Sequence, residues 1–171
     1  MDIVFATPGE WDQFVQNYDM KNFPSGISSD GIINFIKAAM MAQFDPRDDY
    51  SSSKSYFGPK SIDEIKMCPY TSLGSQPREV SIKLIGLIKQ PETAIHLLRV
   101  HVHIELAVPY DGQESVGQFW DIEVNEVAGD VKSVCPNCGA PYTNQAFCSF
   151  CGTELRAMGG ISMMVDKLQL Y

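Results

Sequence analysis

Two cysteine pairs, each with the spacing Cys-x-x-Cys, constrain this chain of 171 residues more than any other feature. Each pair makes a tight turn that points two sulfurs at one metal ion, and a following glycine lets backbone amides turn towards the thiolates. Four thiolates fill a tetrahedral shell and leave no open position for water or substrate. The sequence therefore predicts a structural Zn²⁺ site with four ligands, Cys135, Cys138, Cys148 and Cys151.

Two other chemistries use the same four-cysteine pattern. Iron occupies the same all-sulfur geometry, although zinc is the default ion for such a closed site. Two disulfides would instead suit a secreted protein. The first residues, MDIVFATPGEWD, lack the basic and long apolar segments of an export signal, so we expect reduced thiols and a cytoplasmic location.

Charge and hydropathy argue against a nucleic-acid partner and against a membrane-spanning segment. The formal net charge of −8 repels phosphate backbones, so we expect no nucleic-acid partner. A transcription-related zinc ribbon is for this reason a less favoured hypothesis. The sequence has no run of about 18 apolar residues, so we also expect no membrane span.

The first half of the chain carries helix start signals and helical periodicity. Residues Thr7–Glu10 form a capping-box pattern with proline at the first helical position, which predicts a short helix over about 8–17. Apolar residues recur every three or four positions over about 29–45 and predict the main core helix. A second capping-box pattern, Ser61–Glu64, predicts a short helix or turn to about Met67.

The second half of the chain has strand patterns, partly amphipathic over 80–89 and with a clear period of two from Leu98 to Glu105. Strands are predicted at 80–89, 95–108, 117–127 and 161–171. Hairpin-length links between strands favour antiparallel pairing. The predicted fold class is therefore α+β, with an antiparallel sheet of about four strands and N-terminal helices on one face.

The cysteine motif lies between the third and fourth predicted strands. We therefore divide the chain into two units. An α+β sheet domain comprises residues 1–131 plus 157–171, and an inserted four-cysteine zinc ribbon comprises residues 132–156.

The order of these elements resembles that of a bacterial family. The strand HLLRVHVHIEL, the aromatic strand GQFWDIEV and the segment CPNCGAPYTNQAFCSFCGTEL carry the resemblance, which covers about residues 29–171. The family is related to the C-terminal domain of the mitochondrial inner-membrane import-motor anchor. Its fold is a cone-like α+β domain, similar to cystatin and nuclear-transport-factor-like domains. The resemblance implies a translocase-like, transport- or membrane-complex-associated role with peripheral attachment at the inner face of the membrane.

One strand face offers polar candidates outside the cysteine motif. His101, His103 and Glu105 project from one side of the strand over 95–108. Such a run is most simply a solvated sheet face, and a second metal site there lacks a third ligand. In a cone-shaped fold the same residues, with Tyr110 and Trp120, would line a concave pocket for a small polar ligand.

Two remaining residues have simple structural interpretations. His96 alternates in register with apolar residues, so we expect a core histidine with its hydrogen bonds satisfied. Cys68 stands apart from the two motifs, so we expect an idle thiol and not a nucleophile.

Together these features favour a non-enzymatic, zinc-containing protein-interaction module with a protein partner. The closed four-cysteine site, the absence of a catalytic constellation and the family resemblance all support this hypothesis. The alternative is a small-ligand-binding or enzymatic cone-fold domain that uses the concave pocket.

Overall fold

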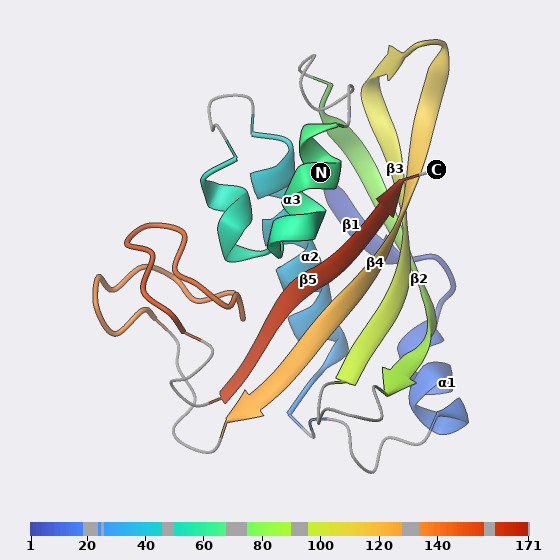
Figure 1. Ribbon diagram of the computed structural model, residues 1–171. Coiled ribbons are helices and arrows are strands. Elements are labelled where there is room, and N and C mark those ends of the chain that lie inside the picture. The colour runs from blue at the N-terminus through green and yellow to red at the C-terminus, as the bar shows by residue number, and fades with distance from the viewer. Residues whose placement is uncertain are drawn as a thin grey trace.

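The described residues of the chain form an α+β fold in a computed structural model. They are 1–18, 24, 26–45, 50–67, 75–89, 96–127, 134–155 and 160–170. Helices lie near the N-terminus and one mixed, mostly antiparallel sheet follows, which confirms the predicted fold class (Figure 1).

The sheet has five strands, which lie side by side in sequence order. They are β1 (Asp2–Phe5), β2 (Pro77–Lys89), β3 (His96–Tyr110), β4 (Gln113–Val127) and β5 (Gly160–Leu170). β2 to β5 pair antiparallel, as predicted. β1 is an additional edge strand that pairs parallel with β2, so the sheet is larger than the predicted four strands and is mixed.

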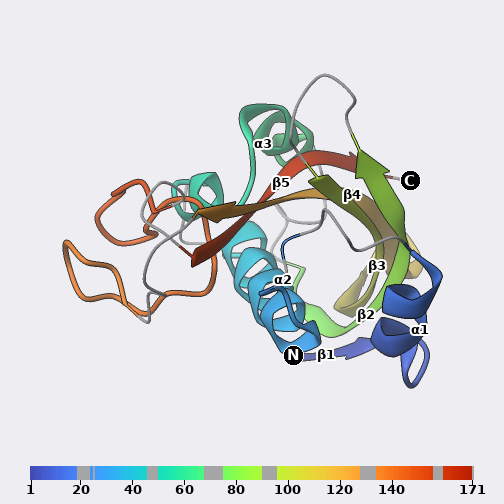
Figure 2. The ribbon, with the colours of Figure 1, turned by 90° about the horizontal axis from the view of Figure 1, so that it is seen from below.

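The described residues also form three α-helices and one short 3₁₀ helix. They are α1 (Glu10–Asn17), α2 (Ser29–Gln43), the 3₁₀ helix η1 (Ser52–Ser55) and α3 (Pro59–Lys66). The sheet curls about α2, as Figure 2 shows, and we call the sheet face towards α2 the inner face. No helix in the described ranges is long and apolar enough to cross a membrane.

The hydrophobic core fills the space between α2 and the inner face of the sheet. Val100, Val102 and Ile104 of β3 are fully buried there, as the alternating sequence predicts. Trp120 of β4 is also fully buried, and its ring meets that of Phe57 edge-on at a centroid distance of 5.3 Å. The concave side of the sheet is therefore a packed core and not a pocket.

The structure contains helices at both predicted places, α1 and α2, but the capping box predicted for α1 is absent. The N-cap of α2 is Ser28, whose hydroxyl accepts a hydrogen bond from the Gly31 amide at 3.1 Å. α1 instead begins after Gly9, at φ 72°, and no side chain caps it. Its Glu10 carboxylate accepts a hydrogen bond from the Leu84 amide at 3.0 Å, a contact with β2 that replaces the predicted capping box.

The second capping-box prediction, at Ser61, is also wrong. α3 begins two residues earlier, at Pro59, with Gly58 as its N-cap. Ser61 lies inside the helix, and its hydroxyl donates to the Val165 carbonyl of β5 at 3.1 Å. A residue that resembles a helix cap therefore attaches α3 to the sheet.

The outer edge of β5 is covered by two segments from elsewhere in the chain. The Val165 amide donates to the Tyr56 carbonyl at 2.7 Å, and the Gly58 amide donates to the Val165 carbonyl at 2.9 Å. The Met163 amide donates to the Asn144 carbonyl at 2.6 Å. These bonds satisfy backbone groups that an edge strand would otherwise expose.

Trp120→Ala should destabilise the fold by about 3–5 kcal/mol, because it leaves a cavity in the core and removes the edge-on contact with Phe57. Denaturant unfolding of the full chain measures the change. The matched control is Phe150→Ala, since Phe150 is 78% exposed and its loss should change stability by no more than about 0.5 kcal/mol. Equal losses for the two variants would contradict this view of the core.

Candidate metal centre

Residues 134–155, here called the cysteine module, contain two small turns of the same design. In the first, the Cys135 amide donates to the Ala140 carbonyl at 2.8 Å, and the Gly139 amide donates back to the Cys135 carbonyl at 2.8 Å. A bridge between Val134 and Pro141 closes the turn. The first cysteine pair is therefore held by a short closed hairpin.

The second turn repeats these bonds. The Cys148 amide donates to the Thr153 carbonyl at 2.9 Å, and the Gly152 amide donates to the Cys148 carbonyl at 2.9 Å. A bridge between Phe147 and Glu154 closes it. Gly152 has φ 74°, close to the 76° of Gly139, and no atom would meet a Cβ there within 4 Å. Backbone conformation, and not lack of space, therefore requires glycine.

The two turns bring their four sulfurs together. All four lie within 4.8 Å of one another, with 3.7 Å between Cys135 and Cys151 and 3.6 Å between Cys138 and Cys148. A tetrahedral Zn²⁺ with bonds of about 2.3 Å places its sulfurs ~3.8 Å apart, whereas a disulfide bond is only about 2.05 Å long. The spacing therefore fits four ligands around one ion and does not fit two disulfides.

The four thiols affect one another's protonation. Hydrogen bonds from the Thr153 hydroxyl and the Asn137 side chain lower the pKa of Cys151 to about 5. The Ala140 amide lowers the pKa of Cys138, but burial and the three neighbouring sulfurs outweigh it and raise that pKa to about 12. Four thiolates this close repel one another, and a divalent cation such as zinc would remove that penalty.

A small hydrophobic cluster supports the cysteines from inside the module. Cys135 and Cys148 are each 2% exposed and pack with Leu155, which is fully buried, and with Ala140 and Tyr142. This cluster is separate from the main core beneath the sheet. Cys138 and Cys151 are exposed, so one side of the sulfur cluster faces the protein and the other faces solvent.

The module is attached to β5 by more than one contact. The Tyr142 hydroxyl donates to the Ile161 carbonyl, and burial raises the pKa of Tyr142 to about 12, so this donor keeps its proton at neutral pH. The Asn144 carbonyl accepts from Met163, and Gln145 forms a parallel bridge with the same residue. Sequence analysis missed these anchors, because nothing in the spacing of the cysteines indicates which strand the module contacts.

The predicted pocket residues do not share one face. His101 and His103 project from the outer face of the sheet, where both are half-buried, and the His101 ring lies 5.1 Å from that of Phe119. Trp120 pairs with Val100 on the inner face and is fully buried. The prediction of one concave pocket that joins Trp120 to the histidines is therefore wrong, because α2 and the core fill the concave side.

The histidines also form no metal cluster. Burial lowers the pKa of His101, and the charges of the nearby His103 and Lys83 lower it further. The lowered pKa favours the neutral form of the imidazole. Glu105 instead pairs with Arg78 at 2.7 Å. Among the described residues, one group of three or more potential metal ligands lies close enough together to share an ion, and it consists of the four cysteines.

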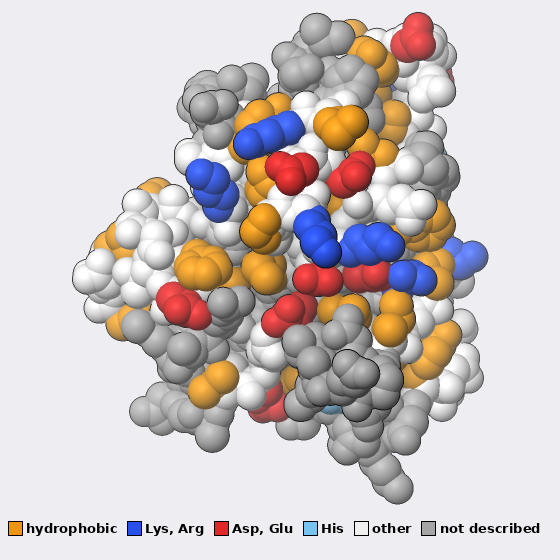
Figure 3. Space-filling model, viewed as in Figure 1, with side chains coloured by type: hydrophobic (Ala, Val, Ile, Leu, Met, Phe, Trp, Pro, Cys, Tyr) orange, Lys and Arg blue, Asp and Glu red, His pale blue; other side chains and the backbone are white. Residues whose placement is uncertain are grey.

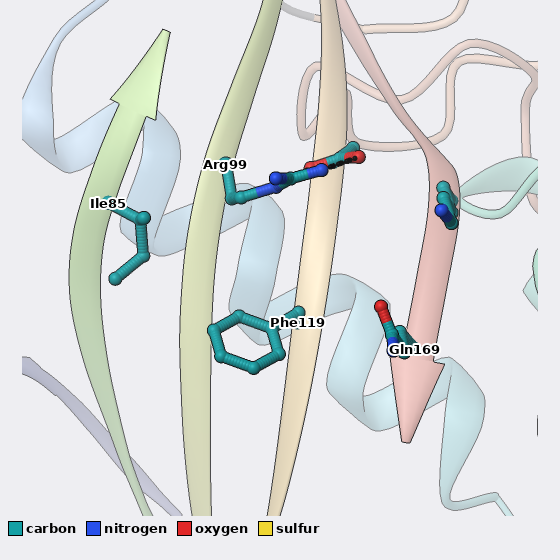
Figure 4. A pocket seen from close by; sticks show the side chains of 6 residues that line it. Ile85, Arg99, Phe119 and Gln169 are labelled. Carbon is teal, nitrogen blue, oxygen red and sulfur yellow. Dashed lines mark hydrogen bonds and ion pairs between the residues drawn. The ribbon is translucent and has the colours of Figure 1, made fainter. Parts of the chain in front are cut away.

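The outer face has a shallow hollow of its own, shown in Figure 4. Arg99 and Asp121 border it as a two-point ion pair, with nitrogen–oxygen distances of 2.7 and 2.9 Å. The hollow has a volume of about 280 Å³, and its other lining residues are Phe119, Ile85, Gln169 and Lys167. Because Asp121 neutralises Arg99, Lys167 is the lining residue whose charge is not paired within the hollow, and it makes the hollow weakly cationic.

Three further residues were named in the predictions, and two of them lie in the described ranges. His96 is half-buried at the start of β3, and so is more exposed than the core position expected for it. Tyr110 is half-buried at the end of the same strand. Cys68 lies outside the described residues.

No protein-family model, curated protein or solved structure matches the chain. The family resemblance of residues 29–171 therefore stays a prediction. The chemistry of the cysteine module is the basis for inferring function.

Tyr142→Phe should loosen the attachment of the module to β5 by about 1 kcal/mol, because it removes the hydrogen bond to Ile161. Hydrogen exchange of the Met163 amide should then rise about fivefold, whereas that of Val165 should not change, since its partner is Tyr56. Tyr18→Phe is the matched control, because it removes a similar tyrosine–carbonyl bond, to Ile85, far from the module. An unchanged Met163 amide in Tyr142→Phe would exclude this attachment.

Proposed function

We propose that the chain is a non-enzymatic protein-interaction module in which Cys135, Cys138, Cys148 and Cys151 bind one structural Zn²⁺. The spacing of the sulfurs carries the proposal, because 3.6 and 3.7 Å suit neighbouring ligands of one tetrahedral ion. Zinc would supply folding free energy to a segment whose own core is small. Structural zinc contributes about 10–16 kcal/mol in small zinc-finger peptides.

A structural role for the metal follows from the ligand set. Four cysteines leave no coordination position for a substrate or an activated water. The module also projects beyond the edge of the sheet, where Figure 1 shows it beside β5. A rigid projection with a closed metal site is suited to docking a protein and unsuited to chemistry.

The resemblance of residues 29–171 supports a proposal for the cellular location and the kind of complex. We propose a cytoplasmic, translocase-like role in a transport or membrane complex, with peripheral attachment to the inner face of the membrane. The formal net charge of −8 supports a protein partner over a nucleic acid.

Purified protein should contain one zinc per chain, and Cys148→Ser should lose it, as elemental analysis by mass spectrometry would show. The matched control is Cys68→Ser, which removes the cysteine outside the two motifs and should keep the metal. Stoichiometric zinc in Cys148→Ser would contradict the ligand assignment.

In Cys148→Ser, we expect the module to unfold while the sheet domain stays folded. The reason is that the cluster around Leu155 and the core around Trp120 are separate. Hydrogen exchange should therefore rise across residues 134–155 and remain slow at Val102 and Ile104. Loss of protection in β3 would instead mean that the metal supports the whole fold.

Affinity capture tests the interaction role directly. The tagged chain is expressed in its native host at natural levels, and the membrane fraction is included in the extract. Mass spectrometry should identify a partner that the full chain retains and Cys148→Ser does not. Absence of any partner above background would refute the interaction role while leaving the zinc assignment intact.

A further inference from the structure

Phe150 is the most exposed aromatic side chain in the described ranges, with 78% of its surface accessible. It lies between Cys148 and Cys151 in the second turn of the module, so two ligands of the candidate metal flank it. Metal binding would fix this turn and hold the ring in place. An apolar ring that is held rigidly in solvent is typical of an interaction surface.

The charge around Phe150 is negative. Residues 134–155 include one acidic residue, Glu154, and no lysine, arginine or histidine. Four thiolates around Zn²⁺ leave a charge of about −2, and Glu154 brings the module to about −3. In Figure 3 the module, at the left, shows a mostly uncharged surface with scattered hydrophobic side chains.

A groove of about 470 Å³ lies beside the ring. Phe147, Phe150 and Ser149 form one wall, and Ser51 and Ser55 of the η1 region belong to the other. Lys54 of η1 also lines the groove, and it is the one charged side chain among the lining residues. The groove therefore has an aromatic wall next to the anionic metal cluster, and a single lysine offsets part of that charge.

We propose that the zinc-loaded module docks a basic, arginine-containing segment of a protein partner against Phe150. This inference rests on the proposed zinc site and names the chemistry of the partner. A guanidinium stacks flat on an aromatic ring, while its positive charge faces the thiolates and Glu154. Acidic peptides and anionic membranes carry the wrong charge for this surface.

The test uses the full zinc-loaded chain and a labelled ten-residue peptide of alternating arginine and glycine. Fluorescence anisotropy at low salt measures the dissociation constant. Phe150→Ala should weaken binding roughly two- to fivefold, which is the strength of an exposed cation–π contact. Met67→Ala is the matched control, because Met67 is equally exposed at 78% but lies at the end of α3, and it should bind as the native chain does.

Two charge-reversal variants test the electrostatic contribution to peptide binding. Lys54→Glu removes the cation from the groove and should tighten binding, whereas Lys60→Glu makes the same change of net charge on α3 and should tighten it less. Binding of the native chain should also weaken as salt is raised. Equal effects of Lys54→Glu and Lys60→Glu would mean that the peptide responds only to net charge, and would overturn the proposal.

Two further outcomes separate this inference from the zinc assignment. If every variant keeps one zinc but Phe150→Ala and Met67→Ala bind alike, the docking surface is wrong and the metal site stands. If the native chain holds no zinc, the proposed function fails first and the anionic surface fails with it. Equal binding of a glutamate–glycine peptide would also overturn the proposal, because an anionic surface should repel it.

Discussion

Backbone pairing along the outer edge of β5 joins the cysteine module and the segment before α3 to the sheet. Val165 bonds to Tyr56 and Gly58, and Met163 bonds to Asn144, so one strand edge orients both the segment that precedes α3 and the cysteine module. An edge strand with unpaired amides is a template for unwanted association. Here the same covering contacts that remove this hazard also position the four sulfurs relative to the sheet.

The chain keeps its site chemistry apart from its main core. α2 and the inner face of the sheet enclose an apolar interior, whereas the cysteines pack around Leu155 in a second, smaller cluster. In the outer hollow, Asp121 neutralises Arg99, and Lys167 leaves a weak positive charge. The four clustered cysteines therefore lie apart from both the main core and this hollow.

Sequence analysis anticipated the local chemistry better than the tertiary contacts. Cysteine spacing indicated the four clustered sulfurs, and the strand patterns, clearest as alternation from Leu98 to Glu105, indicated β2 to β5, because both are local properties of the chain. β1 (Asp2–Phe5) was missed, since four residues carry little periodic signal and their partner lies in β2. Ser61 and Glu10 resembled capping residues, but their side chains bond to Val165 and Leu84, and no local pattern predicts contacts over such separations.

The position of the module between β4 and β5 has a consequence for the order of folding. β5 pairs with β4 through residues such as Val165 and Ile122, but the chain between Val127 and Gly160 must first be closed into a loop. The entropy cost of closure rises with the length of flexible chain, by about 0.6 kcal/mol for each doubling. A metal that joins Cys135 to Cys151 shortens that flexible length, so ion capture would speed the arrival of the last strand and the sheet would assemble fastest where zinc is available.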